Sequence, residues 1–226
     1  MTEKITSKQE NRIADLVRDS VRALGLTKDE AQEIIAQGGK FQTDLKPILQ
    51  KLAMQDQRFG PAIKEFELTV PADYKHDSQL DTFGKKTRKL KITYFYNEEL
   101  TSKNFAKATT KLEPGKTYKV KIFPILSTVT SEDCMNFLRK QKAILAGGQG
   151  LTLAQDLKAD EFSEDKYTVS FDEKNALWKD SGGSHRVPRL RRHSDGGWEF
   201  NLGYFGYDLL DDYYLLCFCE KETLGA

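Results

Sequence analysis

Cysteine and histidine are scarce in this chain of 226 residues, with three of each. The cysteines Cys134, Cys217 and Cys219 are an odd number in a chain too long for a small disulfide scaffold. No C-x2-C or H-x3-H spacing typical of zinc sites is present. Cys217 and Cys219 would point to the same face of an apolar strand. We expect no metal site, and we interpret the cysteines as buried apolar residues.

Long apolar runs are also missing. No stretch comes near the length of about 18 apolar residues that a membrane-spanning helix needs. The first ten residues, MTEKITSKQE, contain no apolar region of the kind found in signal peptides. We therefore expect a protein of the reducing cytoplasm, without a membrane partner.

Recognisable catalytic motifs are absent. No G-x-S-x-G sequence occurs, and Ser184 directly precedes His185, so the imidazole does not reach that hydroxyl in the usual geometry. Asp172 and Glu173 could perform acid–base chemistry, but so could most carboxylate pairs. The sequence predicts no catalytic residue and no cofactor. An enzyme whose site forms only in three dimensions stays open.

Charge of both signs is plentiful but unevenly distributed. Charged residues make up 31% of the chain, with a net charge of only +1. Residues 59–145 have a net charge of +6, whereas residues 146–226 have a net charge of −6. Because complementary charges steer association, the two segments either pack together within one molecule or bring copies into head-to-tail contact.

The periodicity of apolar residues predicts an α+β protein. Thr27-x-x-Glu30 and Ser7-x-x-Glu10 fit capping boxes, and a third helix is expected near Thr43. After Phe59-Gly60-Pro61 the period changes from helical to alternating. We expect a small three-helix unit over residues 1–58. A larger, strand-rich, mainly antiparallel body with one central helix follows over residues 59–226.

Within the body, alternation predicts strands around residues 66–70, 90–96, 118–122, 167–171, 198–202 and 215–219. Residues 72–84 are polar and are expected to form a loop, as are the acidic residues 156–165. Asp195-Gly196-Gly197 is a strong turn signal.

The stretch from Pro114 to Ala146 predicts a turn, a strand and a capped helix. Pro114-Gly115 fits the centre of a type II turn, and Thr130 and Ser131 are good N-caps. We expect the helix to end at the glycines of the sequence 147–150, GGQG. A phosphate loop is not expected there, because such a loop precedes its helix.

Two basic clusters are candidate binding sites. The first consists of Lys85, Lys86, Arg88, Lys89 and Lys91. Aromatic residues follow it, a combination that suits single-stranded nucleic acid; the alternative is a solvated loop and strand edge. The second consists of Arg186, Arg189, Arg191 and Arg192. Guanidinium groups bind phosphates and carboxylates with paired hydrogen bonds, so these arginines either pair internally or bind an anionic ligand or acidic surface. The internal partners would be Asp208, Asp211 and Asp212.

Aromatic residues are dense near the C-terminus. Most are expected in the core, but tyrosine also favours interfaces, and neighbouring glycines suggest a loop that presents some of them outward. The candidate interface residues are Tyr204, Phe205, Tyr207, Tyr213 and Tyr214.

Five phrases carry a resemblance to other proteins: PGKTYKVKIFPI, TSEDCMNFLRKQKAIL, YTVSFDEKNALWKD, HRVPRL and LLCFCE. They resemble a recurring set of uncharacterised proteins from candidate-phylum bacteria of the Parcubacteria type, over roughly residues 66–220. The resemblance implies a bacterial origin, cytoplasmic or associated with a phage or plasmid. It implies no activity, ligand or site.

We expect a non-enzymatic interaction or assembly protein. It would bind a protein partner or self-associate through the basic middle segment, the acidic C-terminal segment and the C-terminal aromatics. The alternative is a nucleic-acid-binding protein that uses the two basic clusters.

Overall fold

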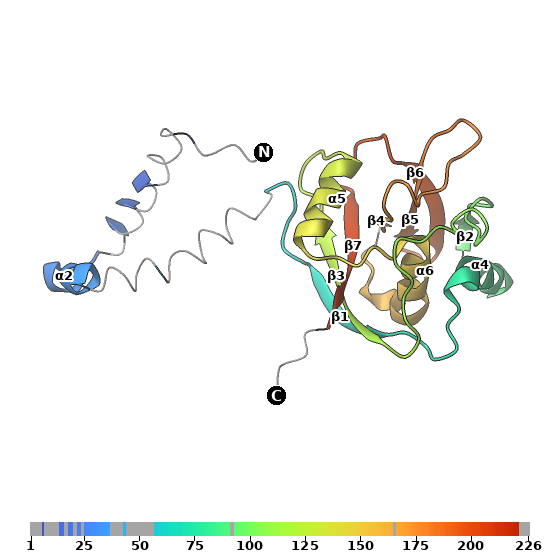
Figure 1. The fold of residues 1–226 in the computed structure, drawn as a ribbon, viewed down its shortest axis with the longest axis horizontal. Coiled ribbons are helices and arrows are strands. Elements are labelled where there is room, and N and C mark those ends of the chain that lie inside the picture. Colours follow the sequence, from blue (N-terminus) through green and yellow to red (C-terminus); the bar gives the residue numbers. More distant parts are fainter. Residues whose placement is uncertain are drawn as a thin grey trace. The chain divides into compact units, whose positions relative to one another are not determined.

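The computed structural model describes residues 57–90, 93–164 and 166–221 continuously. Before them it describes residues 6, 14–15, 18–19, 22–23, 25–36 and 43. The chain divides into two compact units, residues 1–55 and 56–226, and each is described by itself (Figure 1).

The N-terminal unit contains α2 (Lys28–Ala36). Its predicted capping box is confirmed: the backbone N–H of Thr27 donates to Glu30 Oε2 at 2.8 Å, and the N–H of Glu30 donates to the Thr27 hydroxyl at 3.4 Å. The other two predicted helices lie largely outside the described residues.

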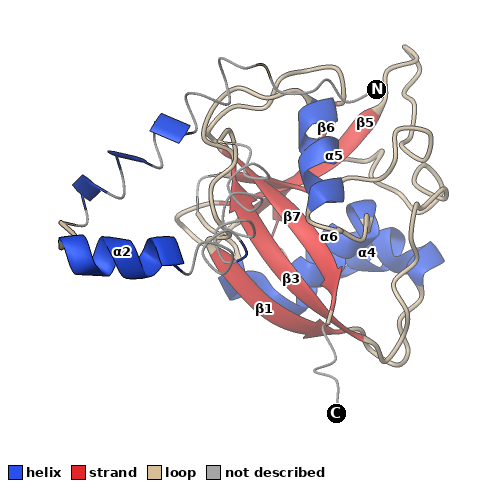
Figure 2. Cartoon of the chain, turned by 60° about the vertical axis from the view of Figure 1, so that its left-hand side comes forward, coloured by secondary structure: helices blue, strands red, loops and turns tan. Residues whose placement is uncertain are grey.

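The larger unit is built on a seven-stranded sheet with the order β1-β3-β7-β4-β5-β6-β2. Figure 2 shows β1, β3 and β7 side by side. The strands are β1 (Lys64–Thr69), β2 (Thr93–Tyr96), β3 (Thr117–Pro124), β4 (Tyr167–Val169), β5 (Arg186–Arg192), β6 (Trp198–Tyr204) and β7 (Tyr213–Glu220). The pairs β4–β7 and β2–β6 are parallel, and the other neighbours are antiparallel. The sheet is therefore mixed, and the fold is α+β.

Three α-helices, not the single one predicted, are described in this unit. They are α4 (Gln79–Leu90), α5 (Ser131–Lys140) and α6 (Gly147–Lys158), with short 3-10 helices η1 (His76–Ser78) and η2 (Ala159–Glu161). The helices α4, α5 and α6 follow the N-terminal unit in the chain, so helices are not confined to the first 58 residues.

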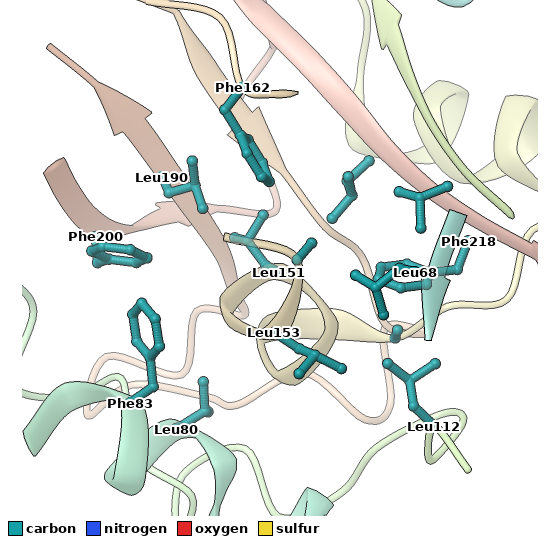
Figure 3. Packing of buried hydrophobic residues seen from close by; sticks show 14 of the residues in the cluster. Leu68, Leu80, Phe83, Leu112, Leu151, Leu153, Phe162, Leu190, Phe200 and Phe218 are labelled. Carbon is teal, nitrogen blue, oxygen red and sulfur yellow. The ribbon is translucent and has the colours of Figure 1, made fainter. Parts of the chain in front are cut away.

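Side chains of the central strands alternate between two cores on opposite faces of the sheet. Val120 and Phe218 belong to one core with residues of α4 and α6, part of which Figure 3 shows. Phe123 and Cys217, from the same strands β3 and β7, pack with residues of α5 instead. Because a strand has a side-chain period of two, this alternation places α5 opposite α4 and α6.

Turns and caps predicted from local sequence are confirmed. Gly115 and Gly196 have φ of 79° and 85°, the left-handed region that turns require of glycine. At the start of α5, the Asp133 N–H donates to the Thr130 hydroxyl at 3.1 Å, and the Thr130 N–H donates to Asp133 Oδ2 at 3.1 Å.

The predicted end of the central helix is wrong. Helix α5 stops at Lys140, and the glycines of residues 147–150 begin α6 rather than closing α5. Glycine is a poor helix former, but here it permits close packing: a Cβ on Gly148 would lie 3.1 Å from Pro188 Cγ. Residues 147–155 are all buried, so burial outweighs the low helix propensity. Helix α6 also takes up part of the acidic stretch expected to be a loop.

The polar stretch expected to be a loop also contains a helix. Helix α4 includes most of the first basic cluster, and its buried residues Leu80, Phe83 and Thr87 recur at helical spacing. Gly84 permits close approach to the Tyr96 ring, whose Cζ lies 2.9 Å from the position of a Cβ. Because this helix has few apolar residues, its helical period is weak in the sequence.

The start of α6 contains a buried carboxylate. Gly147 has φ of 51°, and a Cβ there would lie 1.8 Å from Asp172 Oδ2. The Thr109 N–H donates to Asp172 Oδ1 at 2.8 Å. Burial raises the pKa of Asp172 to about 6, although the hydrogen bonds from Thr109 favour the charged form. A buried helix start occupied by a carboxylate does not suit a phosphate.

Replacing Gly147 with alanine is expected to destabilise the protein by more than about 3 kcal/mol, because it combines positive-φ strain with a clash against Asp172. Gly183→Ala is the matched control: its φ is 81°, but no atom lies within 4 Å of its Cβ position. That variant is expected to lose only about 1 kcal/mol. Equal losses in urea unfolding would show that the clash is unimportant.

The raised pKa of Asp172 predicts a pH dependence of stability. The folded state binds this proton more tightly than the unfolded chain, whose carboxyl has the ordinary pKa of 3.8. The stability contributed by the protonated carboxyl is therefore lost as the pH rises from about 4 through about 6, by about 3 kcal/mol in total. Asp172→Asn is expected to remove this loss, measured by urea unfolding at pH 4 and pH 7. The exposed Asp73→Asn is the control, and an unchanged pH dependence in Asp172→Asn would contradict the prediction.

Candidate anion-binding site

Three of the four arginines of the second basic cluster pair with carboxylates within the molecule. Arg186 donates from Nε to Asp180 Oδ2 at 2.8 Å, and its Nη2 lies 2.6 Å from the same oxygen. Arg192 Nη1 lies 3.9 Å from Asp160 Oδ1. In the part of the chain that the structure describes, none of the predicted partners Asp208, Asp211 and Asp212 forms an ion pair with an arginine of this cluster. The predicted internal pairing occurs, but with carboxylates from other segments.

Glu199 on β6 neutralises the third arginine. Its carboxylate accepts hydrogen bonds from Arg191 Nη2 and the Tyr167 hydroxyl, each at 2.8 Å, and from Asn201 Nδ2 at 3.1 Å. Burial opposes ionisation of Glu199, but these hydrogen bonds and the Arg191 charge outweigh it and lower its pKa. Burial, together with the hydrogen bond to Glu199, raises the pKa of Tyr167 to about 12.

Arg189 is held by aromatic rings instead. Its guanidinium carbon lies 4.2 Å from the centroid of the Tyr167 ring and 5.8 Å from that of Tyr213, and Nη1 donates to the Tyr213 hydroxyl. No carboxylate among the described residues pairs with it. Its Nε is buried and has no hydrogen-bond partner. Such a pre-positioned guanidinium is suited to bind an anion.

Arg189 lines a cavity of about 220 Å³ beside the start of α5. Ser131, the first residue of α5, also lines it; this residue is buried, and its Oγ has no hydrogen-bond partner. Arg189 and Ser131 therefore line one small space, and each has a buried polar atom, Nε or Oγ, without a hydrogen-bond partner among the described residues. The remaining lining residues are Val169, Phe171, Val187, Leu202, Gly203, Tyr204, Tyr207, Asp208, Leu209 and Tyr213. We call this space the Arg189 pocket.

The five predicted interface aromatics separate into two groups. Tyr204, Tyr207 and Tyr213 line the Arg189 pocket, and the rings of Tyr204 and Tyr207 pack with centroids 4.7 Å apart. Phe205 and Tyr214 are buried, with exposed fractions of 4% and 9%. These two residues are therefore core residues rather than surface residues.

Four of the five residues of the first basic cluster lie on α4, which packs on the same face of the sheet as α6, whereas Arg189 and Arg191 lie on the opposite face. Lys86 pairs with Asp156 of α6, and Arg88 donates to the Gly84 carbonyl at 2.9 Å and lies over the Tyr96 ring. Lys85 and Lys89 are exposed, and the side chain of Lys91 lies outside the described residues. The structure does not bring the two basic clusters together.

Sequence reasoning identified Arg189 and the tyrosines but missed Ser131 as a pocket residue. The sequence predicts Ser131 only as an N-cap, and this residue lines the same pocket as Arg189 because the fold brings β5 near the start of α5. No local pattern in the sequence carries that information.

The remaining predictions about special sites concern metals, cysteines and membranes. Among the described residues, no group of three or more metal-ligating side chains is placed to hold an ion. Cys217 is buried, Cys219 is half-buried, and their sulfur atoms lie 3.5 Å apart on the same strand face. None of the described helices has the length and apolar character needed to span a bilayer.

Comparisons of the chain with protein-family models, with curated proteins and with solved structures give no match. The resemblance to Parcubacteria-type proteins stays a prediction.

Proposed function

We propose that this protein is a non-enzymatic interaction protein that binds an acidic side chain of a partner protein in the Arg189 pocket. The observation that carries the proposal is Arg189 itself: a guanidinium fixed by tyrosine rings, without a carboxylate partner among the described residues. Because no described carboxylate neutralises this guanidinium, the pocket that it lines favours an anionic occupant.

The dimensions of the pocket favour a side chain over a larger ligand. A volume of about 220 Å³ is small beside typical small-molecule sites, which start at about 300 Å³. Arg189 offers charged donors, and apolar residues such as Val187 form much of the remaining lining, together with three tyrosines and Asp208. A carboxylate on a short apolar stem matches this combination.

The residues at the rim of the Arg189 pocket are of the types found in protein interfaces. Tyr207 and Tyr204 are 66% and 36% exposed, and the nearby Leu210 is 49% exposed. Tyrosine and arginine are enriched among residues that dominate binding energy, because they offer large contact areas with a polar group.

The opposite charges of the middle and C-terminal segments are partly used within the molecule. Lys64 pairs with Glu161, Lys116 with Glu220 and Arg139 with Glu173. This internal pairing favours a local recognition site over association through whole segments of opposite charge. Arg189 and Arg191 lie on the face of the sheet opposite α4, which also disfavours nucleic-acid binding by both basic clusters together.

The proposal predicts that peptides selected on the immobilised protein from a random library will be rich in Asp or Glu beside apolar residues. Arg189→Gln is expected to lower the affinity for the selected peptides by about 10- to 100-fold, which is the loss expected when charge-assisted hydrogen bonds are removed. Arg189→Lys is expected to restore little of this affinity, because an ammonium group lacks the paired N–H donors of a guanidinium. Affinities would be measured by calorimetry.

Arg192→Gln is the matched control, on the same strand but outside the pocket, and it is expected to bind as the wild type does. Light scattering of the free protein tests whether the partner is a second copy: an oligomer that Arg189→Gln dissociates would identify self-association. Selection of peptides without acidic residues, or equal losses in both variants, would overturn the proposal.

A further inference from the structure

A second cavity is separate from the Arg189 pocket. It has a volume of about 670 Å³ and lies between the segment that follows β2 and the segment that precedes β5. Its chemistry-bearing lining residues are Lys103, Lys107, Lys174, Lys179, Trp178 and His185. The two cavities share no lining residue.

The cavity is lined by four lysines and by no aspartate or glutamate. Acidic residues nearby in the chain are engaged elsewhere: Asp180 pairs with Arg186 and Glu173 pairs with Arg139. Lys174 lies 3.3 Å from Glu132, an exposed pair that contributes little. Within the described residues, Lys103, Lys107 and Lys179 have no carboxylate partner, so the cavity retains a positive field.

The pKa of His185 responds to the positive charge of the cavity. Burial lowers the pKa of His185 below its ordinary value, and the charges of Lys179 and Lys174 lower it further.

Trp178 supplies a flat, fixed surface in the same cavity. Its ring centroid lies 6.2 Å from that of the buried Phe105, and its carbonyl accepts a hydrogen bond from the Arg186 N–H at 2.9 Å. Both contacts hold the residue in place while its side chain stays half-buried. An aromatic side chain beside lysines is the combination that stacks a base and neutralises phosphates.

We infer that this lysine cavity binds the phosphates and base of a nucleotide, either free or within a single strand. The volume falls in the range of about 300–1,000 Å³ that is typical of ligand sites. Lysine ammonium groups bind phosphate as point charges, and four of them match a ligand with several negative charges. This site goes beyond the proposed function, since it uses different residues and a different ligand chemistry.

The test is titration of the full-length protein with adenosine triphosphate and, separately, with a short oligothymidylate, followed by tryptophan fluorescence. The other tryptophan, Trp198, is 5% exposed, so Trp178 is expected to dominate the change, and Trp178→Phe to abolish it. Tighter binding of the triphosphate would identify free nucleotides as the ligand, and tighter binding of the oligothymidylate would identify single strands.

The double variant Lys103→Ala/Lys107→Ala is expected to weaken binding of the preferred probe at least tenfold. The slope of the logarithm of the binding constant against the logarithm of the salt concentration is expected to fall in magnitude by about 2. The control Lys85→Ala/Lys89→Ala removes the same charge from the exposed face of α4 and is expected to bind as the wild type does. Circular dichroism and melting temperature would verify that all variants fold. Absence of binding of both probes at millimolar concentration, or equal weakening in the two double variants, would overturn the inference.

Discussion

Helix α6 begins with nine consecutive buried residues, and the neighbouring elements have to accommodate it. The three glycines in its first turn let Pro188, Phe218 and Asp172 approach its backbone closely. Along its length, Leu151 and Leu153 join one core with β1, β3, β5, β6 and β7 (Figure 3). One face of the sheet is thereby filled, which forces the arginines of β5 that alternate with Leu190 onto the opposite face.

On that opposite face, the supply of carboxylates decides which arginine stays available. Glu199 is opposite Arg191 in the register of β5 and β6 and pairs with it, whereas the residue opposite Arg189 is the neutral Asn201. Arg189 is stabilised by the rings of Tyr167 and Tyr213, which hold a guanidinium without neutralising it. The difference between Glu199 and Asn201 on β6 therefore makes Arg191 part of an ion pair and leaves Arg189 as a candidate binding group.

The two cavities differ in the way they attract anions. The Arg189 pocket is small, largely apolar and equipped with a few oriented donors, which favours geometric recognition of one group. The lysine cavity is three times larger and relies on accumulated charge beside a tryptophan, which favours ligands with several negative charges. Near the lysine cavity, the acids Asp180 and Glu173 are engaged in other ion pairs, whereas Asp208 lines the Arg189 pocket.

Sequence by itself determined the features that depend on neighbours in the chain. The strand alternation around Val120, the turn at Gly115 and the N-cap of Thr130 were predictable, because each depends on residues within a few positions. Tertiary structure alone decided that the glycines at 147–150 begin a helix, since its stability comes from burial against distant strands rather than from local propensity. It also decided which carboxylate pairs with each arginine, and it placed Ser131 beside Arg189. These contacts join residues far apart in the chain, and long-range contacts leave no period or spacing in the sequence.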